Sequence, residues 1–305
     1  MVQLLTVDPE YAGQRLDNFL LAHFRGVPRG LFYRLLRHGA IRVNRHRVQP
    51  KYKLVAADKI TLPQLSVTET QDCAQPSQSR IKQLLSRIIF EDQHLIVLNK
   101  PAGMAVHGGS GINFGIIETL RAAQPSYAKL ELVHRLDRDT SGCLVLAKKH
   151  STLRELQASM RAGNWHKSYV LLVRGHLEEE PQIVLKPLKK LATKSGERIV
   201  TVAPDGKPSE TIFHTRQNFK EFAYLEAELK TGRTHQIRVH AMAIGHQIAG
   251  DPKYGDEELN AELRANGLKR MFLHAEQVSF PWQGKKQHFT ARLDKELLTF
   301  LEHLA

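Results

Sequence analysis

Cysteine is scarce in this chain: its 305 residues include two, Cys73 and Cys143. Cys73 falls in a polar stretch and Cys143 in a strand-like run, so they form neither the pattern of a disulfide framework nor that of zinc ligands. Histidine is more abundant, with 16 residues, but His235 and His240 lie five apart and no HExxH-like spacing occurs. We therefore expect no metal site.

The chain also lacks a long apolar run. No stretch approaches the ~20 residues that a helix needs to cross a bilayer. The first residues, MVQLLTVDPEYAGQRLD, have neither the basic start nor the apolar core of a secretory signal. The sequence therefore predicts a soluble cytoplasmic protein that does not use a membrane.

A nucleotide-binding signature is missing as well. Residues 107–115, HGGSGINFG, are rich in glycine, but their spacing is not G-x-G-x-x-G and no strand-helix-strand pattern surrounds them. No Walker lysine follows a glycine-rich loop anywhere in the chain. We therefore expect no nucleotide cofactor and no other cofactor.

Acidic residues are in the minority, with 31 Asp and Glu against 44 Lys and Arg. The formal net charge is +13 and the isoelectric point is about 9.8. Such an excess attracts polyanions over long distances and favours a nucleic-acid partner. The length suggests two domains, and a hydrophobic content of 42% is ample for a globular core.

Most of the excess positive charge lies near the N-terminus. Residues 13–62 contain eleven Lys or Arg side chains and two acids, Asp17 and Asp58, which is a net charge of +9. Two helices are predicted here. The apolar face of the first consists of Leu16, Phe19, Leu20 and Phe24. The second can open at Pro28 and end at Gly39, and its apolar face consists of Leu31, Phe32, Leu35 and Leu36.

A short strand, a basic turn and a second strand follow these helices. This order, with the stretches RLDNFL and GAIRVNRHRV, resembles the S4 RNA-binding domain. The resemblance implies that exposed basic side chains contact RNA phosphates, whereas without it they would be read as a solvated face. We assign residues 1–62 to this domain and residues 63–87, rich in Ser, Thr, Gln and Pro, to a flexible linker. The candidate RNA-binding residues are Arg29, Arg34, Arg37, Arg42, Arg45, Arg47 and Lys51.

Residues 88–305 are predicted to form an α+β domain on a mainly antiparallel sheet. A helix is expected over 151–163, with Ser151 as its N-cap. Residues 198–214 read as a β-hairpin that turns at a Pro-Asp-Gly sequence. A further helix is expected to open at Thr234, with Ile237, Ala241 and Ile244 facing inward and Arg238 on another side.

One stretch of this domain, ELVHRLDRDTSGCLVLAKK at 131–149, places a charged cluster between two strand-like runs. The bland interpretation is a solvated hairpin loop. A carboxylate in such a loop could instead carry chemistry, provided that a nearby cation keeps it ionised. The residue pattern does not choose between Asp137 and Asp139.

Five segments in order resemble the RluA family of pseudouridine synthases, which makes the solvated-loop interpretation improbable. They are NKPAGMAVHGG at 99–109, VHRLDRDTSG at 133–142, HKSYVLLVRG at 166–175, TGRTHQIRVHAMAIGHQIAGDPKYG at 231–255 and FLHA at 272–275. With the S4-like segment, the resemblance covers residues 13–280. It implies an S4-like domain followed by a catalytic domain built on a mixed, mainly antiparallel sheet.

The resemblance also implies the roles of individual residues. Asp137 would be the catalytic carboxylate and Arg238 the cation paired with it, while Asp139 caps the turn. Tyr169 would pack on the target base and help to remove its C5 proton. Ile237 would contact the base, and Arg135 would enter the gap that the flipped uridine leaves in the RNA.

The closest resemblance within the family is to a synthase that acts on large-subunit ribosomal RNA. We therefore expect that RNA as the partner of a monomeric enzyme. Transfer RNA or small-subunit ribosomal RNA stays open as the substrate, and so does a non-catalytic role in ribosome assembly. The sequence does not say which uridines are modified, or whether Asp137 attacks C1′, attacks C6 or takes a proton from the sugar.

Overall fold

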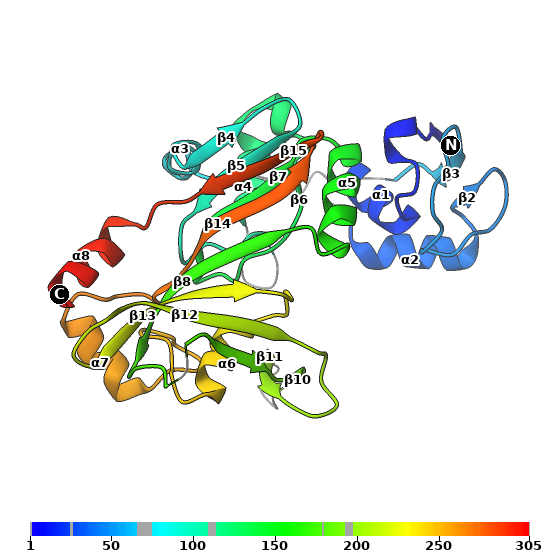
Figure 1. Cartoon of the computed structure of the whole chain (residues 1–305). Helices are drawn as coiled ribbons and strands as arrows, with labels where there is room; N and C mark the ends of the chain where they lie inside the picture. Colours follow the sequence, from blue (N-terminus) through cyan, green and yellow to red (C-terminus); the bar gives the residue numbers. More distant parts are fainter. Residues whose placement is uncertain are drawn as a thin grey trace. The chain divides into compact units, whose positions relative to one another are not determined.

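The computed structural model describes residues 2–24, 27–65, 75–108, 114–178, 180–192 and 198–304. The chain divides into two compact units, one of residues 1–75 with 149–151 and one of residues 76–148 with 152–305 (Figure 1). Arg25, Cys73, most of the glycine-rich stretch 107–115 and much of the predicted linker lie outside the described residues.

The N-terminal unit contains the two predicted helices. These are α1 (Leu16–His23) and α2 (Arg29–His38), and Gly39 ends α2 in the left-handed conformation, as expected. A small sheet in the order β1-β3-β2 completes the unit, with β1 at Val2–Thr6, β2 at Arg42–Val43 and β3 at Lys59–Pro63. The core is apolar and includes the fully buried Leu16, Leu20, Phe32, Ile41 and Ile60.

The two acids of this basic segment are both buried. Asp17 accepts hydrogen bonds from the Arg15 guanidinium, at 3.0 Å to its Nε, and from the Tyr33 hydroxyl at 2.8 Å. Asp58 accepts from the Asn44 side-chain amide at 2.7 Å and also bonds Tyr52 and the backbone of Val55. The acids therefore stabilise the unit internally and leave its surface charge positive.

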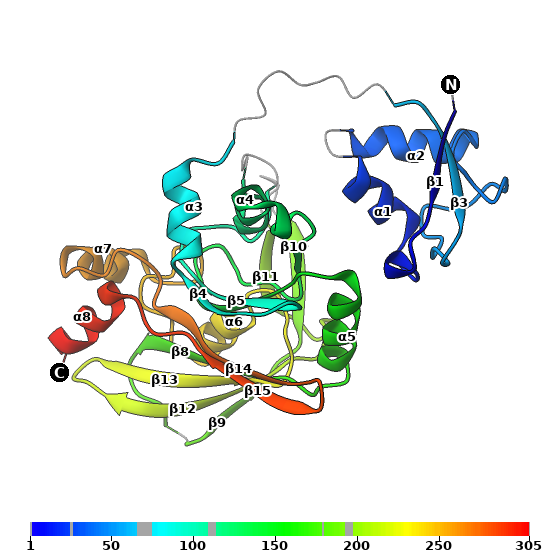
Figure 2. The ribbon, with the colours of Figure 1, turned by 90° about the horizontal axis from the view of Figure 1, so that it is seen from above.

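The C-terminal unit is built on a ten-stranded sheet, in the order β4-β5-β7-β14-β8-β13-β12-β9, with β15 on β14 and β6 on β7 (Figure 2). Most neighbours are antiparallel, whereas β7 and β14 are parallel. The predicted α+β class is thus confirmed. The strands are β4 (Ile88–Glu91), β5 (Leu95–Lys100), β6 (Glu131–Leu132), β7 (Ser141–Ala147), β8 (His166–Arg174), β9 (Gln182–Leu185), β12 (Glu210–Asn218), β13 (Phe222–Leu229), β14 (Leu273–Trp282) and β15 (Lys285–Thr290).

Both faces of the central strands are buried. In β5, Leu95 and Val97 face one core, while Ile96 and Leu98 face the other, as the alternation of side chains in a strand requires. Helix α5 (His150–Arg161) covers the first face and α4 (Ile116–Ala123) the second. The remaining helices are α3 (Gln78–Leu85), α6 (Gln236–Ala243), α7 (Glu257–Ala265) and α8 (Lys295–Leu304).

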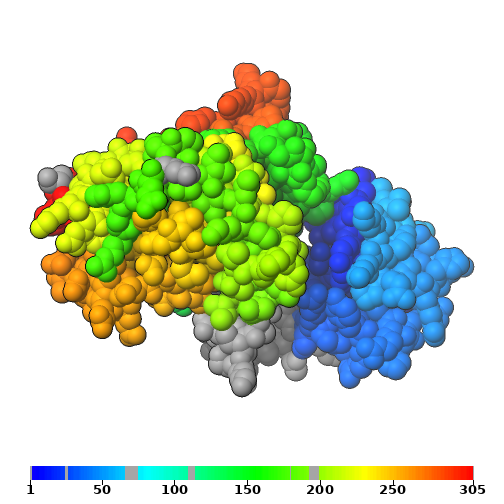
Figure 3. Space-filling view, turned by 60° about the horizontal axis from the view of Figure 1, so that its bottom comes forward, coloured from blue at the N-terminus to red at the C-terminus, as the bar shows by residue number. Residues whose placement is uncertain are grey.

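Helix α6 lies beside a separate two-stranded ribbon of β10 (Leu188–Ala192) and β11 (Arg198–Val202). In Figure 3 the yellow to orange surface of the residues after α6 adjoins the yellow-green surface of the residues around β11 and β12.

The prediction of a hairpin over residues 198–214 is wrong. Strand β11 pairs with β10 and β12 pairs with β13 and β9, so the Pro-Asp-Gly sequence connects two sheets.

Three further boundaries differ from the prediction. Ser151 is the second residue of α5, which starts at His150, so it is not the N-cap. The helix expected from Thr234 starts at Gln236, because His235 before it is left-handed. Residues 78–85, predicted as linker, form α3, whose Ile81 and Leu84 are buried and whose cap is Ser77.

Gly142 allows β7 to approach β14. Its φ is +110°, and a Cβ atom there would lie 2.2 Å from the carbonyl oxygen of Ala275. Only a residue without a side chain fits this conformation and this distance. The glycine therefore fixes the parallel crossing of the two strands directly after the loop that carries Asp137 and Asp139.

We predict that Gly142→Ala lowers the free energy of unfolding by about 3 kcal/mol or more, because the methyl group would meet a strand backbone that cannot move freely. Gly163→Ala is the matched control. Gly163 also has a positive φ, of +80°, but a Cβ there would contact nothing within 4 Å, so only ~1 kcal/mol of backbone strain is expected. Urea unfolding of the three proteins checks this, and equal losses for the two variants would contradict it.

Candidate active site

A pocket of about 310 Å³ opens beside the loop between β6 and β7. Most of its lining residues come from three parts of the chain that are distant in sequence. These are loop residues 134–137 and Thr140, the β8 residues Lys167 and Tyr169, and residues 232–238, which lead into α6. Met160, Leu229 and Leu273 complete the lining. The pocket thus brings together segments that the sequence singled out separately.

The first tie on the loop is His134. Its Nε2 accepts a hydrogen bond of 3.1 Å from the backbone N–H of Val145 in β7. Burial, with a smaller contribution from the nearby charge of Lys167, lowers the pKa of His134 to about 3, so the ring is neutral and can accept. The ring also packs edge-on against Trp165. The ring therefore ties the start of the loop to β7.

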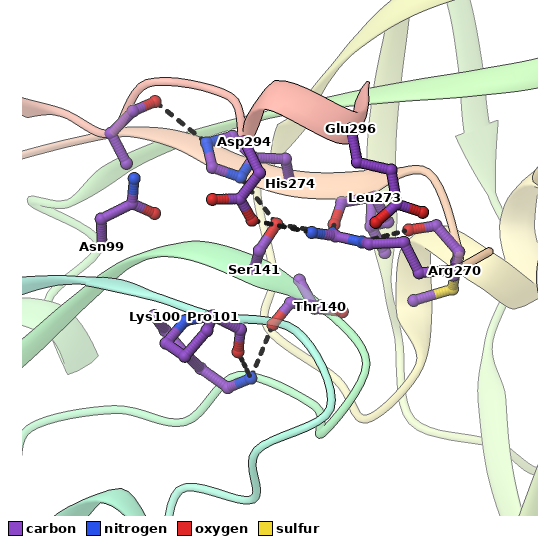
Figure 4. A network of polar contacts seen from close by, with 12 residues as sticks. Asn99, Lys100, Pro101, Thr140, Ser141, Arg270, Leu273, His274, Asp294 and Glu296 are labelled. Atoms are coloured by element: carbon purple, nitrogen blue, oxygen red, sulfur yellow. Dashed lines mark hydrogen bonds and ion pairs between the residues drawn. The ribbon is translucent and has the colours of Figure 1, made fainter. Parts of the chain in front are cut away.

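The second tie is the buried ammonium group of Lys100. It donates to the backbone carbonyls of Pro101 and Thr140 at 2.9 and 2.8 Å (Figure 4), and to that of Arg138 at 2.8 Å. Two of these carbonyls flank Asp139 in the turn, so the lysine holds the backbone directly after Asp137. Burial lowers the pKa of Lys100 to about 7.

A polar network supports the far end of the loop, where β7 begins. The Ser141 hydroxyl contacts Nδ1 of His274 at 2.8 Å and accepts from Arg270 Nη2 at 2.6 Å (Figure 4). Arg270 in turn pairs with Asp294 at 3.0 Å. These contacts fix the loop to β14 and to the segment before α8.

Arg238 brings positive charge to the pocket. Its Nη1 lies 4.0 Å from Oδ2 of Asp137. Its Nε and Nη2 donate to the two carboxylate oxygens of Asp251 at 2.7 and 2.6 Å. Arg238 and Asp251 are 4% and 1% exposed. Burial opposes the charge of the guanidinium, but the pair with Asp251 keeps the pKa of Arg238 raised, so it is a permanent cation facing Asp137.

His235 also approaches the Asp137 carboxylate, with Nε2 3.8 Å from Oδ2. Its Nδ1 is 2.8 Å from the Tyr254 hydroxyl, which already accepts from the backbone N–H of Val200. Burial lowers the pKa of His235. A neutral ring that accepts a hydrogen bond from the Tyr254 hydroxyl at Nδ1 carries its own proton on Nε2, and this N–H faces Asp137.

Tyr169 and Ile237 form apolar walls of the pocket, and both are buried. Burial, and next the charge of Asp137, raise the pKa of Tyr169. The phenol is therefore protonated at neutral pH, and its ring is available for packing. Arg135 also lines the pocket, but its side chain is exposed to solvent.

Asp139 does not cap the turn by a backbone hydrogen bond in the part of the chain that is described. Its side chain instead pairs with that of Arg138 at 3.3 Å. The seven basic candidates of the N-terminal unit, from Arg29 to Lys51, are all exposed on that unit. Two of them have contacts within it, since Arg29 bonds the Tyr33 hydroxyl and Arg42 bonds the carbonyl of Gly39.

Sequence reasoning missed four residues of this site, namely Lys100, His235, Asp251 and Tyr254. All four fall within segments that carried the family resemblance, but their side chains acquire roles only through contacts with distant residues. The Asp251-Pro-Lys-Tyr254 order was the available signal, since an acid before a proline often starts a turn. It could not have revealed Arg238 as the partner of that acid.

Among the residues that the structure describes, no cluster of three or more His, Cys, Asp or Glu side chains could bind a metal ion. Within the same residues, no helix combines the length and the apolar character needed to cross a membrane.

Comparisons with known proteins identify the family of this chain. Residues 94–243 match the model of the RNA pseudouridylate synthase family, and residues 14–60 match that of the S4 domain. A Yersinia pestis protein named ribosomal large subunit pseudouridine synthase C is 47% identical over 97% of this chain and 94% of its own length. The proteins of the same name from Haemophilus influenzae and Escherichia coli are 46% and 45% identical over 99% of this chain, and over 95% and 97% of their own lengths.

Solved structures show the same fold. Human RNA pseudouridylate synthase domain containing 4 superposes with a TM-score of 0.62 at 24% identity, over 74% of this chain and 95% of its own. Human RNA pseudouridylate synthase domain containing 1 superposes with a TM-score of 0.60 at 23% identity, over 72% of this chain and 86% of its own. Since the curated relatives are nearly half identical over almost the full length, the chain belongs to the RluA family of pseudouridine synthases and carries an S4 domain at its N-terminus.

Proposed function

We propose that this pseudouridine synthase isomerises specific uridines in large-subunit ribosomal RNA, with Asp137 as its catalytic carboxylate. The observation that carries the proposal is the position of Asp137 in the pocket, where the Arg238 guanidinium and His235 both lie within 4.0 Å of its carboxylate. The RNA is inferred from the names of the relatives, which are similar over nearly their whole length. We also expect a cytoplasmic monomer that uses no cofactor.

The reaction breaks the N1–C1′ bond of uridine and forms a C5–C1′ bond, while C5 loses a proton and N1 gains one. No redox change and no energy input are needed. An ionised carboxylate can attack C1′ or C6, or take a proton from the sugar, and so keep the base bound while it turns. All three routes begin with the same group, Asp137.

Arg238 supports this step by its charge. A carboxylate in a pocket is driven toward its neutral form by burial, and a cation nearby counteracts this. Arg238 stands 4.0 Å away without a close hydrogen bond to Asp137, since its Nε and Nη2 bind Asp251. Asp137 therefore has a cation beside it, and its oxygens stay available to the substrate.

Tyr169, Ile237 and Arg135 would handle the base. A uridine can reach a pocket of this kind only after it leaves its stack, at a cost of a few kcal/mol. The buried faces of Tyr169 and Ile237 would offset part of that cost by packing on the uracil. The raised pKa of Tyr169 favours this packing role over a role as proton acceptor. The exposed Arg135 would fill the space that the base vacates.

The S4 domain would bind RNA phosphates. Its seven candidate side chains, Arg29, Arg34, Arg37, Arg42, Arg45, Arg47 and Lys51, are exposed, while the two acids of the same segment are buried and hydrogen-bonded. A surface of this composition attracts a polyanion strongly. We propose residues 1–62 as this domain, with a linker after it and the catalytic domain at 88–305.

Two alternatives lead to different results in experiments. A synthase for transfer RNA or small-subunit ribosomal RNA would keep the site and change the substrate. An assembly factor would bind ribosomal RNA without turnover. The presence of Asp137, Tyr169 and Arg238, the residues proposed for the reaction, argues against this alternative.

We predict that Asp137→Asn lowers turnover by at least about 100-fold, the lower end for a positioned catalytic group, and leaves RNA affinity and stability nearly unchanged. The substrate is large-subunit ribosomal RNA with tritium at uridine C5, and release of tritium to water is measured. Asp139→Asn is the matched control, since this acid pairs with Arg138, and it should keep turnover within a few-fold. Full activity of Asp137→Asn would refute the assignment.

Asp251→Asn should lower both stability and turnover, which separates it from Asp137→Asn. It leaves the buried Arg238 without its carboxylate partner, and breaking such a pair costs about 3–5 kcal/mol. Asp256→Asn is the control, because asparagine also caps a helix and Asp256 is the N-cap of α7. Thermal unfolding and tritium release are measured together. A fully stable and active Asp251→Asn protein would show that the pair does not position Arg238.

Replacing Arg34, Arg37, Arg45 and Arg47 together by Gln should flatten the salt dependence of RNA binding. Each lost phosphate contact lowers the slope of log K against log salt by about 0.7–0.9. The control replaces four exposed lysines of the C-terminal unit, Lys220, Lys285, Lys286 and Lys295. Equal slopes for the two quadruple variants would show that general charge, and not the S4 domain, determines the binding.

A further inference from the structure

Lys167 lies in the active-site pocket next to Tyr169, and nothing above gives it a role. Residues two apart in a strand share a face, so Lys167 and Tyr169 of β8 both point into the pocket, and both line it. Ser168 between them faces the opposite side, where its hydroxyl donates to Glu226 at 2.6 Å. The strand therefore presents a cation and an aromatic ring to the same cavity.

The acids of the neighbouring strand do not neutralise Lys167. Glu226 and Glu228 of β13 lie on the other face of the sheet. There Glu226 binds Ser168 and Arg216, and Glu228 binds Lys230 and His166. On the pocket face, β13 presents Ala227 and Leu229, which are apolar and buried. Glu226 and Glu228 therefore have their partners on one face of the sheet, and Lys167 has no acidic neighbour from β13 on the other face.

Within the part of the chain that the structure describes, the Lys167 ammonium has no hydrogen bond or ion pair. It is half-buried, and this burial lowers its pKa. Lys167 and Asp137 line the same pocket, but among the described residues no ion pair joins them. The Lys167 ammonium therefore lies in a different part of the pocket, beyond ion-pair distance of the Asp137 carboxylate.

This part of the pocket is its mouth. A Cβ atom on Gly232 would come within 3.5 Å of the Lys167 ammonium, and Gly232 itself is exposed. Arg233 and Arg135, both exposed, also line the pocket. A ligand at this position would meet positive charge from three side chains, and the lysine among them is half-buried without a partner among the described residues.

Withdrawing a cation from water is costly unless an anion compensates. We propose that Lys167 binds the phosphate next to the target uridine when that nucleotide enters the pocket. This deepens the proposed function and rests on it. A phosphate at the mouth places the ribose between Lys167 and Asp137 and leaves the uracil to pack on Tyr169. Lys167 would thus set how deeply the nucleotide enters, by a contact present only after flipping.

The test combines Lys167→Met with an RNA fragment that carries one methylphosphonate, which removes a single phosphate charge, on either side of the target uridine. Affinity is measured in the Asp137→Asn protein, so that no turnover is needed. We expect Lys167→Met alone, and the methylphosphonate alone, to weaken binding about tenfold. At one of the two linkages, the two changes combined should weaken binding no more than either one does. This lack of additivity identifies the contact.

Lys286→Met is the matched control, since Lys286 is an exposed lysine of β15, and its loss should multiply with that of either methylphosphonate. Lys167→Arg should keep most of the affinity, and unchanged thermal unfolding excludes a folding defect. The proposal would be overturned if the affinity losses from Lys167→Met and from the methylphosphonate multiplied at both linkages. It would also be overturned if Lys167→Met left RNA affinity unchanged but reduced turnover in the protein that keeps Asp137, because this indicates a contact to the uracil. Lack of turnover by the wild type would instead contradict the proposed function, while the affinity cycle would still report on Lys167.

Discussion

The buried pair of Arg238 and Asp251 is the interaction on which the candidate site depends. Both groups are out of contact with water, and each satisfies the other through two short hydrogen bonds. Asp251 also accepts from the backbone of Lys253 and Tyr254, so the turn after α6 is fixed to the helix. The ring of Tyr254 lies 4.9 Å from the guanidinium carbon. Burying two charges brings little stability, so the gain is a cation held in one place beside Asp137.

The regular parts of the fold were predictable because their patterns are local. The spacing of Leu16, Phe19 and Leu20 indicates α1, and Gly39 marks the end of α2. Strand pairing is less accessible. The Pro-Asp-Gly turn after β11 looks like a hairpin turn, but β11 finds its partner in β10, and only long-range contacts decide this. Helix α3 was missed because its short apolar face, Ile81 and Leu84, is surrounded by residues typical of a linker.

The site was predictable as a set of residues and not as a set of contacts. Asp137, Tyr169, Ile237 and Arg238 were named from a family resemblance, and the fold places all four around one pocket. The residues that support them are different in kind. Lys100 acts through its long side chain on carbonyls of the loop, and carbonyls leave no trace in a sequence. In the sequence, Lys167 is one polar residue of a strand, and its lack of a partner follows only from the ion pairs on the other face of the sheet.

The hydrogen bond between Ser141 and His274 spans 133 residues of sequence. It has a consequence for the protein during its own synthesis. A growing chain acquires Lys100 and the loop of Asp137 early, whereas the cation, its buried acid and strand β14 are translated much later. Until then the carboxylate has no cation beside it and its loop has no strand to rest on. The pocket around the proposed catalytic carboxylate is therefore complete only once β14 has been translated, and a chain that stops before residue 238 holds Asp137 without the cation beside it.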